Sequence, residues 1–137
     1  MSGSSAPASA VVNAMTVDVE DYFQVSAFEP HVDREDWRDI PCRVETNTCR
    51  ILELFAARGV KATFFTLGWV AERYPQLPRL IVEQGHELAS HGWEHRRVNS
   101  QSPAQFRADI ERTRKLLEDL AGVQVRGYRA ASYSLGE

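Results

Sequence analysis

The order of apolar segments limits the fold of this chain more than any other feature of its sequence. Short apolar runs, several of them rich in β-branched residues, alternate with segments in which apolar residues recur at helical spacing. The strand-like runs cover residues 11–20, 60–68, 86–90 and 123–130. Strands that alternate with helices form parallel sheets or barrels, because each helix returns the chain to the start of the next strand. The sequence therefore predicts an α/β fold whose site lies at the carboxyl ends of the strands.

Two of the intervening helices have clear boundaries. The first covers residues 44–58 and is ended by Gly59, because glycine readily takes the left-handed conformation at a helix C-terminus. The second begins at Ser102 and Gln105, which have the spacing of a capping box, and we expect it to end at Gly122. Both helices lie between predicted strands, as a parallel arrangement requires.

The composition indicates one globular domain and excludes several classes of partner. The 137 residues are 43% apolar and 26% charged, and the formal net charge is -3 without any run of Lys or Arg. Neither nucleic acid nor an anionic membrane surface is therefore an expected partner. Residues 1–10 are small and polar, without the features of a signal peptide or a membrane span. We expect them to be a flexible leader before a domain over residues 11–137, in a cytoplasmic protein.

Acidic side chains and histidines follow two different predicted strands. Asp18, Glu20 and Asp21 end the first strand, and His91 and His95 come directly after the third. The carboxyl ends of parallel strands meet at one edge of a sheet or barrel. We therefore expect these acids and imidazoles to lie close together.

The spacing of His91 and His95 suits a metal ion. Side chains four residues apart lie on one face of a helical turn, so both imidazoles can reach one ion. A nearby carboxylate completes three protein ligands and leaves a position open for water or substrate, as hydrolytic zinc sites require. Taken alone, such a pair is also typical of solvated or capping histidines. The shared edge with the acidic cluster favours the metal site.

Three segments of the chain resemble known sequence motifs. They are TVDVEDYF, GHELASHGWEH and YRAASYS, and in this order they are similar to the first three motifs of the polysaccharide deacetylases, carbohydrate esterase family four. The opening DVEDYFQVSAF is most similar to the branch associated with bacterial exopolysaccharide loci that also encode exosortase-type systems. The resemblance implies a distorted (β/α) barrel, a divalent metal ion with zinc as the first candidate, and removal of acetyl groups from N-acetylated sugars of a polysaccharide or oligosaccharide.

The resemblance also implies roles for individual residues. Asp18 matches the general base, and His91 and His95 match the two metal-ligating histidines. Arg129 matches the arginine that orients the catalytic aspartate by a charge-assisted hydrogen bond.

The third metal ligand is left open by the sequence. In the family it is a carboxylate near the base, but Val19 stands where the commoner members have a second aspartate. Strand alternation places Glu20 on the same face as Asp18, which favours Glu20. Asp21 is the shorter aspartate that the family usually employs, so both carboxylates remain candidates.

The expected sugar contacts are aromatic and polar residues near the same edge. Tyr133 or Ser132 falls where the family contributes to the acetate pocket, although RAAS replaces the more usual proline-rich run. Trp93 stands between the two histidines and is a second candidate to contact a sugar ring.

The chain shows fewer strands than a complete barrel. A closed (β/α) barrel takes about eight strands and 250 residues, and no Leu-His pair of the family's later motifs follows Arg129. We therefore expect the N-terminal part of such a barrel, truncated at its C-terminal side, inactive alone and able to self-associate through its incomplete edge. The alternatives are an inactive metal- or saccharide-binding module and a hydrolase of the same fold that acts on a small cyclic amide.

Overall fold

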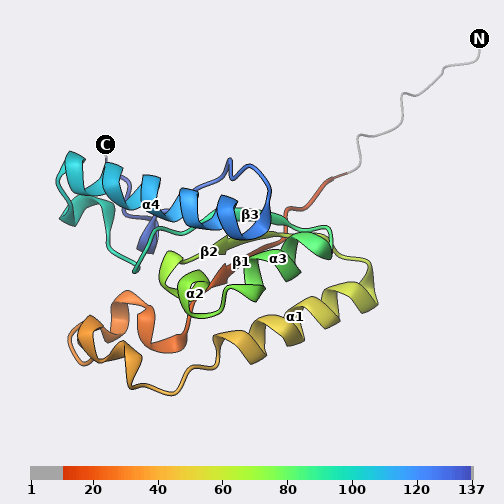
Figure 1. Ribbon diagram of the computed structural model, residues 1–137, viewed down its shortest axis with the longest axis horizontal. Coiled ribbons are helices and arrows are strands. Elements are labelled where there is room, and N and C mark those ends of the chain that lie inside the picture. Colours follow the sequence, from red (N-terminus) through yellow and green to blue (C-terminus); the bar gives the residue numbers. More distant parts are fainter. Residues whose placement is uncertain (1–10, 137) are drawn as a thin grey trace, which may run out of the picture.

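The sheet at the centre of the protein is parallel. The computed structural model describes residues 11–136, so the expected leader at residues 1–10 lies outside it. Within this range three strands pair in the order β1, β2, β3 (Figure 1). They are β1 (Thr16–Val19), β2 (Thr63–Thr66) and β3 (Glu87–Ser90). Because both pairings are parallel, the carboxyl ends of the strands meet at one edge, and the predicted α/β class is confirmed.

The first strand is shorter than the apolar run that predicts it. The sequence indicates a strand over residues 11–20, but Val11 and Val12 are 87% and 90% exposed. The register explains this difference. Thr16 pairs with Thr63 at the start of β2, so no residue of β2 lies opposite Val11 or Val12.

Residues 123–130 do not form the fourth strand that their pattern predicts. They meet the sheet at an isolated parallel bridge between Ser90 and Tyr128. There Ser90 exchanges backbone hydrogen bonds of 2.8 and 2.9 Å with the residues on either side of Tyr128. The chain then bends into the 3-10 turn η5 (Ala131–Tyr133), which ends the pairing. This one bridge is enough to place Arg129 at the carboxyl edge of the sheet.

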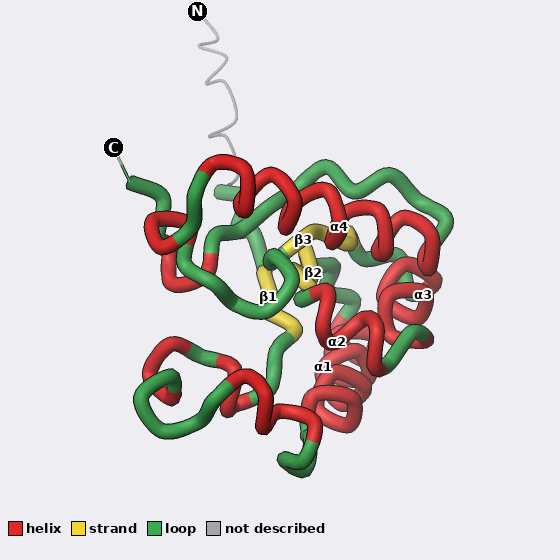
Figure 2. The backbone as a smooth tube through the Cα atoms, turned by 60° about the vertical axis from the view of Figure 1, so that its left-hand side comes forward, coloured by secondary structure: helices red, strands yellow, loops and turns green. Residues whose placement is uncertain are grey.

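Helices lie against the sheet along much of its length. They are α1 (Val44–Arg58), α2 (Gly68–Arg73), α3 (Gln76–Glu83) and α4 (Pro103–Ala121). Figure 2 shows α1, α2 and α3 grouped beside the sheet, with α4 passing close to β3, which it contacts. The predicted boundaries are confirmed: Ser102 and Gln105 form a capping box, and Gly59 and Gly122 end α1 and α4 with φ of 64° and 69°.

The core lies between the sheet and these helices. Phe64 of β2, Leu52 of α1, Ile81 of α3 and Leu117 of α4 are all fully buried. Each such side chain stabilises the folded state by about 1.5–3 kcal/mol relative to exposure. This packed core fixes the position of the strands and of their carboxyl ends.

A long segment between β1 and α1 forms a separate lobe, drawn in orange in Figure 1. It contains the 3-10 turns η1 (Tyr22–Gln24), η2 (Ser26–Phe28) and η3 (Arg34–Arg38). Three aromatic rings tie the lobe to α2 by edge-to-face contacts with centroids 5.7 to 6.2 Å apart; they belong to Phe23, Trp37 and Trp69. The lobe is therefore packed against the domain and can supply residues to the site.

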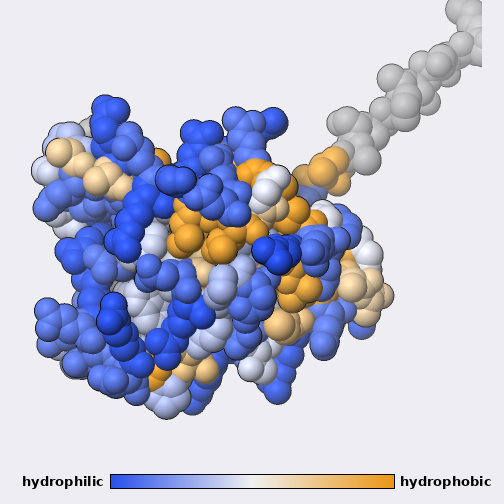
Figure 3. Space-filling view, in the orientation of Figure 1, coloured by the Kyte–Doolittle hydropathy of each residue, from blue (hydrophilic) through white to orange (hydrophobic). Residues whose placement is uncertain are grey.

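The surface in Figure 3 is largely hydrophilic, with apolar side chains gathered mainly over α4 and α3. These two helices pack against each other. No helix in residues 11–136 has both the length and the hydropathy to span a membrane.

Candidate metal centre

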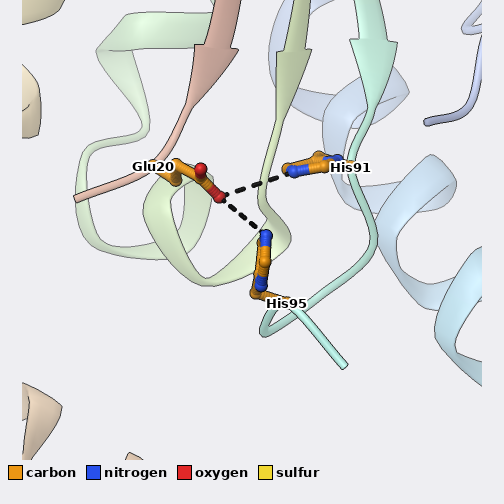
Figure 4. A group of neighbouring side chains, drawn as sticks. All are labelled: Glu20, His91 and His95. Carbon is orange, nitrogen blue, oxygen red and sulfur yellow. Dashed lines mark ion pairs between the residues drawn. The ribbon is translucent and has the colours of Figure 1, made fainter. Parts of the chain in front are cut away.

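Three side chains from distant parts of the chain point toward one another at the carboxyl edge of the sheet (Figure 4). Glu20 follows the last residue of β1, His91 follows the last residue of β3, and His95 lies four residues further along the same loop. Glu20 Oε2 is 3.2 Å from His95 Nε2 and 3.4 Å from His91 Nε2. One ligand atom from each residue lies within 4.8 Å of the other two, so a single ion can contact all three.

The hydrogen bonds around this group fit a bound cation. Within residues 11–136, Glu20 Oε2 and His91 Nε2 are buried and have no hydrogen-bond partner. His91 Nδ1 lies 2.8 Å from the backbone carbonyl oxygen of Arg129, which assigns a proton to Nδ1 and leaves the Nε2 lone pair directed at Glu20. A carboxylate oxygen and an imidazole nitrogen that face each other in a buried site need either a proton or a metal ion between them. Two imidazoles and one carboxylate also form a common ligand set of catalytic zinc.

The environment shifts the pKa values of the two imidazoles in opposite directions. Burial lowers the pKa of His91, but contacts with Glu20 and with the Arg129 carbonyl outweigh burial, and the net pKa is raised. Burial lowers the pKa of His95, Glu20 opposes this, and His91 adds to the decrease. Because a metal binds the unprotonated imidazole, it competes with the proton on His91.

Asp18 lies beside the group and is held by Arg129. Arg129 Nη1 donates to Asp18 Oδ1 at 2.6 Å, and Arg129 Nη2 donates to Thr16 Oγ1 at 3.0 Å. The other carboxylate oxygen, Oδ2, lies 4.0 Å from His91 Nε2. Asp18 is therefore adjacent to the three converging side chains without being one of them, and one of its oxygens is free of Arg129.

Asp21, the alternative third ligand, is engaged elsewhere. Its Oδ2 accepts hydrogen bonds from the backbone amides of Arg43 and Val44 at 2.7 and 2.9 Å, at the start of α1. The backbone stays extended at Asp21, with φ of -91° and ψ of 158°, so the alternation of β1 continues and turns Asp21 away from Glu20. The structure thus places Glu20, and not Asp21, with the histidines.

The loop that carries the histidines differs from the predicted helical turn. Gly92 and His95 have φ of 78° and 55°, and the segment between them is neither helix nor strand. This backbone sends Trp93 away from the histidines. Its ring packs beneath Gly68, where an added Cβ would lie 2.3 Å from it, and the guanidinium of Arg112 covers it at 3.3 Å. Trp93 is therefore a packing residue and not part of the histidine cavity.

A cavity of about 270 Å³ opens over the three converging side chains. Its floor contains Asp18 and Arg129 as well, and its far wall comes from η2 and η5. In that wall Ser26 Oγ and Ser132 Oγ are hydrogen-bonded at 2.6 Å, and Tyr133 is 79% exposed. Ser132 and Tyr133 both have φ of 51°, a left-handed conformation that non-glycine residues adopt rarely and mostly where tertiary contacts impose it.

Tyr133 and Ser132 both line this cavity, and their contact with a sugar stays a prediction. The structure adds Ser26, which the sequence analysis missed. No local pattern around Ser26 signals a site, because its place in the wall depends on a contact with a residue more than a hundred positions away.

Curated relatives with the same kind of sequence are deacetylases. A peptidoglycan-N-acetylglucosamine deacetylase of Bacillus cereus is 35% identical over 75 residues, which are 55% of this chain and 27% of that protein. A chitooligosaccharide deacetylase of Sinorhizobium fredii is 42% identical over 65 residues, 47% of this chain and 28% of that protein. The matched segments are thus about a quarter of the length of these relatives.

Solved structures share the fold at lower identity. The peptidoglycan deacetylase PdaC of Bacillus subtilis superposes with a TM-score of 0.70 at 20% identity, over 90% of this chain and 50% of that one. A CE4-family pseudoenzyme of Bacillus anthracis superposes with a TM-score of 0.67 at 22% identity, over 90% of this chain and 36% of that one. An enzyme and a pseudoenzyme thus have the same fold, so activity depends on the residues of the site.

The family model for polysaccharide deacetylases matches residues 36–135, most of the described chain. This match includes both histidines and the arginine, while the acids of β1 precede it. The chain belongs to the polysaccharide deacetylase family, whose enzymes are hydrolases that act on amide bonds.

Proposed function

We propose that this protein is a zinc-dependent deacetylase that removes acetyl groups from N-acetylated sugars of a bacterial exopolysaccharide. The observation that carries the proposal is the convergence of Glu20, His91 and His95, in which Glu20 Oε2 and His91 Nε2 are buried without a hydrogen-bond partner in the part of the chain that the structure describes. The names of the relatives support an N-acetylated sugar as substrate. The similarity of DVEDYFQVSAF to the exosortase-associated branch supports an exopolysaccharide.

The ligand set leaves room for chemistry at the ion. Glu20, His91 and His95 would hold zinc through three protein atoms, and sites with three protein ligands have a position free for water or substrate. Zinc supplies Lewis-acid polarisation of the amide carbonyl and lowers the pKa of water.

In this proposal Asp18 takes the proton of the attacking water. Its Oδ1 is fixed by Arg129 at 2.6 Å, so the carboxylate cannot turn freely, and Oδ2 is directed toward the imidazole of His91. A general base has to be within reach of the water and should not itself be tied to the ion. Arg129 acts through Asp18 as a positioning residue.

The cavity wall is suited to a sugar. Ser26 and Ser132 supply hydroxyl groups that can donate and accept, and the exposed ring of Tyr133 offers an apolar face. The free oxygen of Asp18 and the wall residues lie around the same cavity. A sugar bound against Tyr133 would thus present its acetamido group to the base.

Zinc titration by calorimetry tests the metal centre. We expect one site in the wild-type protein, and we expect His91→Ala and His95→Ala each to weaken it by more than about 100-fold, beyond the 10- to 100-fold typical of residues that only support ligands. His31→Ala is the matched control, because His31 is exposed and lies outside the group. Equal affinity in all four proteins would refute the proposed metal centre.

Acetate release from N-acetylated chitooligosaccharides tests the reaction. Release that depends on His91 and Asp18 supports the deacetylase, whereas zinc and saccharide binding without release indicates a binding module. Hydrolysis of a cyclic ureide in place of the sugar would indicate the small-amide hydrolase.

A further inference from the structure

The loop that carries the two histidines is held from outside, by three different elements. Gly92 and His95 are both left-handed, a conformation that is unfavourable for histidine in the absence of other contacts. The backbone carbonyls of Gly92 and Trp93 accept hydrogen bonds of 2.9 Å from the amides of Gly68 and Trp69 at the start of α2. Two charged side chains bind three further backbone groups of the loop, the carbonyls of Glu94 and His95 and the amide of Trp93.

Arg34 contacts the loop from the lobe between β1 and α1. Its Nε donates to the carbonyl oxygen of Glu94 at 3.0 Å, and its Nη2 donates to the carbonyl oxygen of His95 at 3.3 Å. Glu29 accepts from the same Nη2 at 2.9 Å, and the guanidinium lies over the ring of Trp37 at 5.7 Å. Contacts within the lobe thus fix the orientation of the guanidinium that binds the loop.

Asp109 contacts the same loop from α4. Its Oδ1 and Oδ2 lie 3.1 and 3.3 Å from the backbone amide of Trp93, which donates to both. The carboxylate comes so close that a Cβ added to Gly92 would lie 2.9 Å from Oδ2. Glycine at position 92 therefore permits both the positive φ and the approach of Asp109.

We propose that Arg34 and Asp109 are positioning residues that clamp the Gly92–His95 loop from two sides and keep His95 Nε2 directed at Glu20. A cationic donor binds the carbonyls at the end of the loop, and an anionic acceptor binds the amide at its middle, so the left-handed turn between them is retained. This inference rests on the proposed metal centre. Arg34 precedes the residues that the family model matches, and through Arg34 the β1–α1 lobe contacts the histidine loop.

The clamp should set metal affinity without contact with the metal. Removal of a residue that hydrogen-bonds to a metal ligand typically weakens metal affinity by about 10- to 100-fold. We therefore expect Arg34→Ala and Asp109→Ala each to weaken zinc affinity by about tenfold or more, as measured by calorimetric titration of the full chain. Asp109→Asn keeps a carbonyl oxygen that accepts from Trp93 and should recover most of the affinity. Arg34→Lys carries its donors on a single nitrogen, which cannot replace both Nε and Nη2 of the arginine, and should recover little.

Matched controls separate the clamp from a general loss of charge or stability. Arg38→Ala removes an exposed arginine from the same 3-10 turn as Arg34, and Asp119→Ala removes an exposed aspartate from α4. Both should bind zinc within about twofold of the wild-type protein, because surface substitutions away from such contacts change little.

Amide hydrogen exchange without added metal provides the second measurement. In Arg34→Ala and Asp109→Ala, exchange should accelerate at residues 93–96 and stay unchanged in the core of α1, which a purely global destabilisation would not produce. Unchanged zinc affinity and unchanged loop exchange in both alanine variants would overturn the clamp. If the wild-type protein bound no zinc, the proposed function would fail, and loop exchange alone would decide whether the clamp exists.

Discussion

At the scale of single residues, two carboxylates separated by one position have different surroundings. Asp18 is held by the guanidinium of Arg129, whereas Glu20 faces His91 and His95 with an oxygen that has no donor within residues 11–136. The alternation of β1, continued one residue past its end, puts both on the cavity side, and the different partners assign them different roles. The distinction lies in the neighbours and not in the acid type.

Substitution of these two carboxylates should separate metal binding from reaction. Asp18→Asn should keep zinc affinity within about tenfold and reduce acetate release by about 100- to 10,000-fold, because proton transfer is lost while the ligands remain. Glu20→Gln should lose zinc, since a neutral amide is a weak ligand compared with a carboxylate. Calorimetry and an acetate assay measure the two effects. Loss of zinc in Asp18→Asn with retention in Glu20→Gln would reverse the two assignments.

At the scale of elements, a carboxylate connects the end of β1 to the beginning of α1. Asp21 is 2% exposed, and its Oδ2 accepts from the amides of Arg43 and Val44, which have no partner inside the helix. Its negative charge also lies at the positive end of the helix dipole. These hydrogen bonds join the first and last residues of the lobe between β1 and α1.

Asp21→Ala tests this structural role against the alternative of a metal ligand. We expect the free energy of unfolding to fall by about 1–2 kcal/mol, the usual cost of losing a helix cap, with zinc affinity close to that of the wild-type protein. Denaturant unfolding and calorimetry measure the two quantities. Glu45→Ala is a useful control, since Glu45 lies in the first turn of the same helix without capping it. A severe loss of zinc with unchanged stability would show that Asp21 is a ligand.

At the scale of the whole molecule, the site is assembled where the sheet, the lobe and the C-terminal segment meet. β1 and β3 flank β2, and within residues 11–136 no further strand pairs with the outer side of β1. Exposed strand edges tend to pair with other chains. Met15 directly precedes β1, and its apolar side chain is 49% exposed.

We expect the protein to self-associate through the outer edge of β1. Sedimentation should show a mass that rises with protein concentration, and Met15→Lys should reduce this association because a charge at a strand edge disfavours pairing. Leu54→Lys is the matched control, as Leu54 is similarly exposed, at 55%, but lies on α1. A monomer at all concentrations, or equal association in both variants, would contradict the prediction.

Local features of the sequence were sufficient to predict several helices and strands. α1 and α4 have the predicted boundaries because caps and left-handed glycines act within a few residues of the helix ends. The three strands were recognisable as apolar runs, since helices cover part of each strand. The pair of histidines and the acids could be assigned to one edge because parallel strands share an orientation.

Contacts between distant segments determined the arrangements that local sequence features could not predict. Asp21 accepts hydrogen bonds from the start of α1, so Glu20 is the carboxylate that faces the histidines. Trp93 packs against Gly68, and residues 123–130 pair with the sheet at a single bridge. In each case the competing arrangements are similar in local propensity, so hydrogen bonds and packing between distant segments determine the outcome. The sequence by itself determined the order of elements and the kinds of residue at the site. Only the tertiary structure decided which of those side chains face the same point, because that choice depends on atoms that lie far apart along the chain.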